Sequence, residues 1–172
     1  MSQKKLFFTS DWHIGHEKSI VYDKRPFADL DTMHQKLINN YNSTVTPDGV
    51  CYFLGDVGLG NREVTRSVIS QLHGTKVCVL GNHDPNMTAM YEVGFDVVLY
   101  GAVIYLAGQR ITLSHCPLMG VFREDTTNMR GGTTNGNWHG ELKHRRYSFV
   151  DEGQYHLHGH IHAGPVLSLI HI

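Results

Sequence analysis

The stretch Val50-Cys51-Tyr52-Phe53-Leu54-Gly55-Asp56 decides the fold class of this chain. An apolar run rich in β-branched and aromatic residues predicts a buried strand, and the polar residue after a glycine marks where that strand ends. Val77-Cys78-Val79-Leu80 likewise leads into Gly81-Asn82-His83-Asp84, and Leu6-Phe7-Phe8-Thr9 leads into Ser10-Asp11-Trp12-His13. The first half of the chain therefore contains three predicted strands, each followed by a polar cluster.

Two amphipathic helices are expected between these strands. Thr32 and Gln35 form a capping-box pair at the start of the first, and Asn61 can cap a second that ends at Gly74. A shorter helix is expected from Pro85. The apolar positions are Met33, Leu37, Ile38 and Tyr41 in the first helix and Val64, Val68 and Leu72 in the second. Alternating strands and helices predict a parallel sheet with right-handed crossovers.

The remaining apolar runs follow one another closely, so antiparallel pairing is expected for them. They are residues 97–100, 103–106, 111–113 and 166–169, with a short run from Tyr155. Between them, residues 126–137 are rich in Gly, Thr and Asn and have little to bury. We expect residues 1–172 to form one domain, with an active-site loop at about 116–154.

Composition narrows the functional classes. The chain has 172 residues, a net charge of −1 and 13 histidines. No apolar run approaches the roughly 20 residues that span a bilayer, and near-neutral charge argues against a stable nucleic-acid complex. The three cysteines form no Cys-x-x-Cys pair and the start of the chain lacks a signal-peptide pattern, which favours a reducing, cytoplasmic location. The histidines are the feature to explain.

Polar clusters occur at five predicted strand ends, where open α/β sheets bind their ligands. Residues two apart on an extended segment point the same way, so Asp11 with His13, and His160 with His162, can serve one centre. A glycine before Asp56, before Asn82 and before His160 removes a Cβ where the backbone turns tightly beside a filled site.

These clusters supply oxygen and imidazole donors but no thiolate. The full set is Asp11, His13, Asp56, Asn82, His115, His160 and His162. That is too many donors for one tetrahedral ion and suits two divalent transition-metal ions of the Mn, Fe, Zn or Ni type, with Mn favoured. Asp56 stands alone between the paired motifs, so it is the candidate bridging carboxylate.

The order Asp-x-His, Gly-Asp, Gly-Asn-His-Asp, a lone His after a strand, and Gly-His-x-His resembles the calcineurin-like metallophosphoesterase superfamily. The resemblance spans residues 11–162. It implies an α/β fold, a four-layer αββα sandwich of two mixed sheets flanked by helices. It also implies that His83 protonates the leaving oxygen and that Asp56 bridges two ligand sets: Asp11, His13 and His162 for one ion, and Asn82, His115 and His160 for the other.

Departures from the superfamily narrow the expected activity. Its protein phosphatases carry a second Asp and an Arg shortly after Gly-Asp, and residues 57–61 lack both. Its repair nucleases add a capping domain for which this chain is too short. The pattern from Asp11 to His16, with Arg25-Pro26-Phe27 after it, resembles the small single-domain bacterial and phage-type phosphoesterases.

The expected activity is dinuclear-metal hydrolysis of phosphate esters by metal-activated water. We favour a phosphodiesterase acting on small nucleotide-like or cyclic phosphates, with a broad-range phosphomonoesterase as the alternative. A nuclease and a non-catalytic scaffold rank below both. The oligomeric state is left open.

Several other residues have two readings. His16 can contact a phosphate or cap a turn, and Arg25 can pair with a phosphate or anchor its own loop, the loop being slightly favoured. His139 lies near a basic stretch between two of the metal motifs; such a stretch is more often a solvated surface, and a substrate contact is the alternative. Asp84 can orient His83 or cap the helix near Pro85. Trp12, between two ligands, is expected to point into the core.

Overall fold

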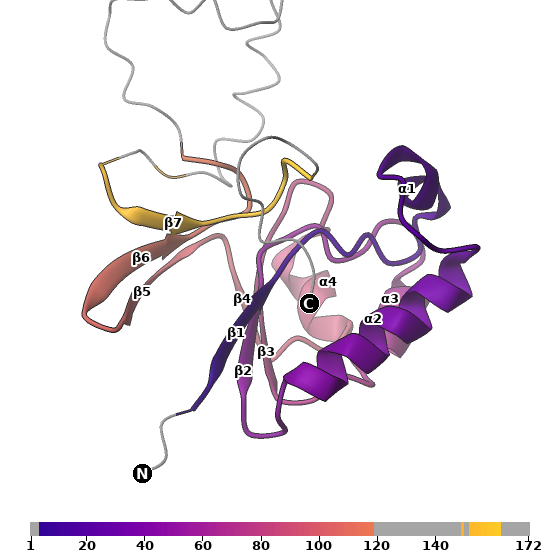
Figure 1. Cartoon of the computed structure of the whole chain (residues 1–172), viewed down its shortest axis with the longest axis horizontal. Coiled ribbons are helices and arrows are strands. Elements are labelled where there is room, and N and C mark those ends of the chain that lie inside the picture. The colour runs from indigo at the N-terminus through magenta and orange to yellow at the C-terminus, as the bar shows by residue number, and fades with distance from the viewer. Residues whose placement is uncertain (1–3, 119–148, 150–151, 163–172) are drawn as a thin grey trace, which may run out of the picture.

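The computed structural model describes residues 4–118, 149 and 152–162, which form two β-sheets and four helices (Figure 1). The first sheet contains β1 (Leu6–Thr9), β2 (Val50–Phe53), β3 (Thr75–Val79) and β4 (Val97–Leu99), in that spatial order. All three pairings are parallel. The predicted parallel sheet is therefore confirmed, and β4, expected to pair antiparallel, joins it.

The register of the first sheet aligns the ends of its strands. Thr9 of β1 pairs with Phe53 of β2, which pairs with Cys78 of β3. Because these strands are parallel and end level with one another, the loops that follow them leave the sheet at one edge. That edge receives the polar residues after β1, β2 and β3.

Four helices connect the strands: α1 (Glu17–Tyr22), α2 (Leu30–Thr44), α3 (Arg62–Ile69) and α4 (Met87–Glu92). In Figure 1, α2, α3 and α4 lie on one side of the first sheet. The sheet order never reverses, so successive right-handed crossovers place their helices on the same face.

The helix caps refine the predicted boundaries. Asp29, not Thr32, caps α2, because its carboxylate accepts the Thr32 backbone N–H at 2.7 Å. Asn61 caps α3 as predicted, but that helix ends at Ile69 and the chain reaches Gly74 through a turn. Asn86 caps α4 just after Pro85. Helix α1 was not anticipated, since its six residues show no apolar period.

The main core lies between the helices and the first sheet. Phe53 of β2 is completely buried and packs its ring against Trp12, Tyr41 and Phe95. Trp12 therefore points into the core as predicted, and its Nε1 donates to Thr9 Oγ1 at 2.7 Å. This packing holds the backbone of residues 10–13 against the end of β2.

The second sheet contains β5 (Ala102–Leu106), β6 (Gln109–Leu113) and β7 (Tyr155–Leu157). The β5–β6 pair is an antiparallel hairpin as expected, whereas β7 pairs parallel to β6. A second core, containing Leu54, Val79 and Leu113, packs this sheet face to face on the first. Because β6 and β7 end together, His115 and residues 158–162 leave the second sheet side by side.

The described residues show part of the predicted four-layer αββα sandwich of two mixed sheets. Residues 4–118 and 152–162 form three layers, namely helices, first sheet and second sheet (Figure 1), and the first sheet is wholly parallel. Among the described residues, no helix covers the outer face of the second sheet. The predicted strand at 166–169, His139 and most of the loop expected at 116–154 lie outside the described residues.

Within the described ranges, no helix has both the length and the apolar character needed to cross a lipid bilayer.

Candidate metal centre

Backbone hydrogen bonds join the loops that follow β1 and β2. The Asp11 N–H donates to Gly55 O and the His13 N–H donates to Asp56 O, each at 3.0 Å. The polar side chains after the two strands therefore lie side by side at the edge of the first sheet.

One group of possible ligands consists of Asp11, His13 and His162, whose donor atoms lie within 4.8 Å of one another. His13 Nε2 is 3.0 Å from His162 Nε2, which is 3.5 Å from Asp11 Oδ1. Imidazole nitrogens and a carboxylate that converge in this way suit a cation. The three residues are one of the two sets implied by the resemblance.

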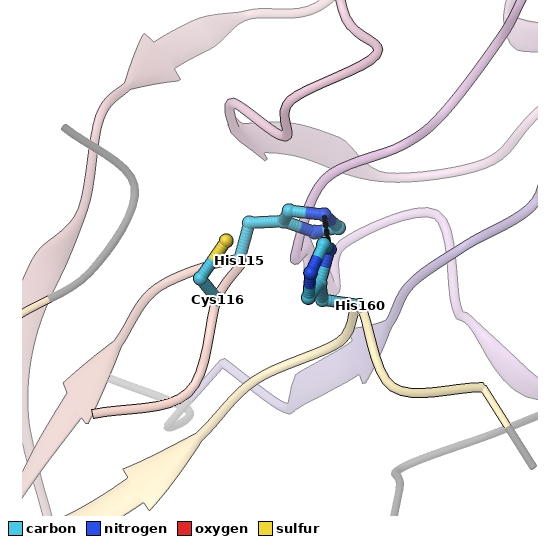
Figure 2. Close-up of side chains that lie close together, drawn as sticks. All are labelled: His115, Cys116 and His160. Atoms are coloured by element: carbon cyan, nitrogen blue, oxygen red, sulfur yellow. Dashed lines mark hydrogen bonds between the residues drawn. The ribbon is translucent and has the colours of Figure 1, made fainter. Parts of the chain in front are cut away.

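A second group forms around His115, which is completely buried. Its Nδ1–H donates to Leu54 O at 2.8 Å, so its Nε2 faces Asn82 Oδ1 at 2.9 Å and His160 Nδ1 at 3.2 Å. Figure 2 shows the two imidazoles against each other, with Cys116 beside His115. The Cys116 sulfur also lies within 4.8 Å of donor atoms of both histidines, so a thiol that the sequence reading left out of the set borders this group.

Asp56 lies between the two groups. Its Oδ2 is 3.3 Å from His115 Nε2 and 4.0 Å from His13 Nε2. With Asp11 and His115 it forms a further set of possible ligands. The structure thus brings all seven predicted ligand residues together, and the buried His and Asp groups can bind a metal ion.

Five of these seven residues have left-handed backbone conformations. Their φ angles are 55° at Asp11, 51° at His13, 52° at Asp56, 73° at His160 and 40° at His162. We predicted extended segments for Asp11 with His13 and for His160 with His162. This prediction is wrong, because β1 and β7 end before these residues. Left-handed backbone costs a non-glycine residue about 1–2 kcal/mol, and such strain clusters at functional sites.

Three glycines allow the loops to approach one another, as predicted. A Cβ at Gly81 would clash with the Asp56 carboxylate, and one at Gly159 would clash with the Asp11 carboxylate. At Gly55, where φ is +84°, a Cβ would clash with the His115 ring. Each glycine thus removes a side chain that would push apart two of the predicted ligands.

The protonation states of the buried groups suit cation binding. Burial alone would raise the pKa of Asp56, but the His115 hydrogen bond and charge lower it to about 2. Burial lowers the pKa of His13 to about 4. Hydrogen bonding to Asp11 raises the pKa of His162 to about 9 against the opposing effect of burial, with Asp23 adding to the increase. A cation therefore meets ready carboxylates and a neutral His13 but must displace a proton from His162.

His83 lies at the open side of the site. Its side chain is 48% exposed, and its Nε2 is 4.0 Å from Asp56 Oδ2. Its backbone N–H donates to Asp56 Oδ1 at 2.9 Å. It borders an open cavity of about 290 Å³ lined by His13, His16, Ser19, Tyr22, Asp23, Asp56, His83, His160, Ile161 and His162.

Asp84 has neither of its two predicted roles, which were to orient His83 or to cap the helix near Pro85. Its buried carboxylate accepts the backbone N–H groups of Gly81, Asp56 and Val57, each at 2.8 Å. Asn86 caps α4, and no described contact joins Asp84 to the His83 ring. Burial raises the Asp84 pKa to about 6. Asp84 therefore clamps the loops that follow β2 and β3.

The loop reading of Arg25 matches its contacts. Its guanidinium donates to Asp11 O and Trp12 O, both at 2.8 Å, and to Asp23 Oδ2 at 3.0 Å. The group that was a candidate for phosphate binding thus supports the loop carrying Asp11 and His13.

His16 lies at the N-terminus of α1, and its ring faces the cavity; a phosphate contact remains a prediction. Its carbonyl accepts the Ser19 N–H and hydroxyl at the start of α1, while its ring lines the cavity. Its Nδ1 is buried and has no hydrogen-bond partner among the described residues.

Sequence reasoning missed Asp23, whose Oδ1 is 2.8 Å from His162 Nδ1. The two residues are 139 positions apart, and no motif contains Asp23. Asp23 lies two residues before Arg25, and this spacing was the one local signal. The spacing does not indicate that Asp23 contacts a histidine.

Comparisons with known proteins find similarity in sequence and in fold, but they indicate no activity. No family model matches the chain. It is 37% identical over 86 residues to uncharacterized protein MJ1445 from Methanocaldococcus jannaschii, covering 49% of each, so it spans about half the length of that relative. It is 28% identical to the gene 66 protein of Mycobacterium phage D29, covering 95% of this chain and 81% of that protein. The crystal structure of AQ665 from Aquifex aeolicus, a protein of unknown function, matches with a TM-score of 0.59 and 26% identity, over 72% of this chain and 67% of that one.

Proposed function

We propose that this protein hydrolyses phosphate esters with two divalent transition-metal ions, Mn favoured, as its resemblance to the calcineurin-like metallophosphoesterases implies. The observation that carries the proposal is the position of Asp56, 3.3 Å from a histidine of one ligand group and 4.0 Å from a histidine of the other. The two face-to-face sheets are compatible with the sandwich fold of that superfamily.

The donor chemistry fits the proposed ions. Imidazole nitrogens, carboxylates and a carboxamide suit Mn, Fe, Zn or Ni. Asp11, His13 and His162 would hold one ion, Asn82, His115 and His160 the other, and Asp56 would contact both. When bound, such a pair lowers the pKa of a shared water and neutralises charge on the phosphoryl oxygens.

His83 is the proposed general acid. Its imidazole faces the cavity and is accessible to a substrate, while its backbone is fixed by the bond to the Asp56 carboxylate. It would donate a proton to the oxygen that leaves phosphorus. His16, on the wall beside His13, can donate an N–H to a phosphoryl oxygen.

The walls of the cavity favour a diester. None of the described residues lining it is Lys or Arg, and the Arg25 guanidinium is engaged by Asp23 and two carbonyls. A phosphomonoester carries a second negative charge that would lack a basic side chain, whereas a diester carries one. The volume of about 290 Å³ suits a small, nucleotide-like substrate.

The direct test compares two chromogenic esters on the full chain loaded with Mn²⁺. We expect faster hydrolysis of bis-p-nitrophenyl phosphate than of p-nitrophenyl phosphate, and no hydrolysis of either after chelation. Preference for the monoester would replace the diesterase assignment with the phosphatase alternative. The proposed function would be overturned if the protein hydrolysed neither of the two esters and no member of a panel of cyclic nucleotides and 2′,3′-cyclic phosphates.

A further inference from the structure

Asp23 and Arg25 form an ion pair beside one half of the metal centre. They lie between α1 and α2, and their side chains are 20% and 8% exposed. Asp23 Oδ2 accepts from Arg25 Nη2 at 3.0 Å and from Nε at 3.2 Å. Both Arg25 donors hold the same carboxylate oxygen, so the other oxygen of Asp23, Oδ1, is directed to a different partner.

This ion pair reaches two of the three residues in the Asp11–His13–His162 group. Asp23 Oδ1 contacts His162 Nδ1 at 2.8 Å, while Arg25 donates to the carbonyl of Asp11 at 2.8 Å. The pair thus links a loop of the first sheet with a segment that follows β7.

The contact with Asp23 selects the nitrogen that His162 presents to the site. An ionised carboxylate only accepts, so a proton on Nδ1 faces Asp23. Nε2 then faces His13 Nε2 at 3.0 Å and Asp11 Oδ1 at 3.5 Å. A carboxylate behind a ligating histidine fixes its tautomer and strengthens it as a ligand.

The other half of the site is supported differently. His115 Nδ1 donates to the neutral Leu54 carbonyl at 2.8 Å. The carbonyl also fixes the tautomer, but it adds no negative charge behind the ring.

We propose that Asp23 is a positioning residue that raises the affinity of the Asp11–His13–His162 half for a divalent cation, with Arg25 holding its carboxylate in place. The inference rests on the proposed metal-dependent function. It concerns one ion of the pair, so it is tested by metal binding rather than by hydrolysis.

The test titrates metal-free protein with Mn²⁺ and follows free Mn²⁺ by electron paramagnetic resonance. We expect two bound ions in the wild type and, in Asp23→Asn, about 10–100-fold weaker binding of one of them. Glu92→Gln is the matched control, because it removes the same charge from the exposed Arg62–Glu92 pair, whose atoms are 3.0 Å apart. Equal weakening in both variants, or none in Asp23→Asn, would overturn the inference.

Paired variants identify the affected ion. In a His13→Ala background, adding Asp23→Asn is expected to leave the remaining ion unchanged, whereas in an Asn82→Ala background it is expected to weaken that ion. The reverse pattern contradicts the assignment. A wild type that binds no Mn²⁺ contradicts the proposed function itself, which separates the two failures.

A measurement on the wild type covers the case in which Asp23→Asn does not fold. Nitrogen-15 spectra of the histidine side chains in Zn²⁺-loaded protein are expected to show His162 protonated at Nδ1 and ligating through Nε2. Ligation through Nδ1 would overturn the inference without any variant.

Discussion

Asp11, His13 and Asp56 follow strands of the first sheet, and each of their side chains is at most 5% exposed, whereas the side chain of His162 after β7 is 31% exposed. Asp56 is held at its backbone by the buried Asp84 carboxylate. Residues 158–162 follow β7 and form the β7 segment. Hydrogen bonds hold this segment to the first sheet, such as the bond from the His160 N–H to the Asp11 carboxylate at 3.1 Å. The first sheet therefore supplies a buried framework, and the β7 segment completes the site from outside it.

The largest expected effect separates these two regions directly. Asp56→Ala removes the carboxylate that contacts both groups, so we expect loss of both ions and hydrolysis at the background rate. His162→Ala removes one partly buried ligand, so one ion should remain bound. Metal content of the purified variants, measured after gel filtration, checks both expectations. Retention of two ions by Asp56→Ala would contradict the central position of this residue.

A smaller effect is expected at His83, which comes from the first sheet but is exposed to the cavity. His83→Ala should keep both ions and lower kcat by about 10²–10⁴-fold, the usual contribution of a positioned acid. The loss should be greatest for substrates with poor leaving groups, because these depend most on protonation. Kinetics across a series of phenyl phosphodiesters measures this trend. An equal loss for all leaving groups would argue against proton donation.

The smallest expected effect is a pH dependence of the free energy of unfolding, which we assign to His162 in the β7 segment. The pKa of His162 is raised from 6.5 to about 9, chiefly by the hydrogen bond to Asp11. The protonated His162 side chain therefore stabilises the metal-free protein fully below pH 6.5, and this stabilisation is lost as the pH rises through 9. We expect the free energy of unfolding to fall across this interval in denaturant titrations.

His162→Gln is the control for the pH dependence, because it removes the titrating group and keeps a polar side chain. Its free energy of unfolding should decrease less between pH 6.5 and 9. An unchanged dependence in this variant would assign the effect to another group and weaken the comparison between the two regions.

The parallel sheet and the ligand loops could be predicted from sequence because their signals are local. An apolar run followed by Gly55-Asp56 or by Gly81-Asn82 contains both the strand and the polar residue at its end. The cap at Asn61 was equally local, since it depends on residues one or two positions away. Thr32 was the wrong cap because Asp29, three residues earlier, offers a carboxylate to the same turn.

Other features could not be predicted because they depend on partners far apart in the chain. The parallel pairing of β7 with β6 brings Leu157 beside Leu113, and with it His160 beside His115. The role of Asp84 depends on N–H groups from two separate loops, and a motif that pairs it with its neighbour His83 gives no indication of this.

By itself, the sequence determined the kinds of donor atoms, their order, and their positions at strand ends, because hydrophobic periodicity and glycine placement act over a few residues. Only the tertiary structure decided the left-handed backbone at five of the seven predicted ligands, the position of Asp56 between two groups, and the contact of Asp23 with His162. Such features arise when sheet register and core packing bring separate loops together. The energy of those long-range contacts offsets the local strain that the short-range signals would avoid.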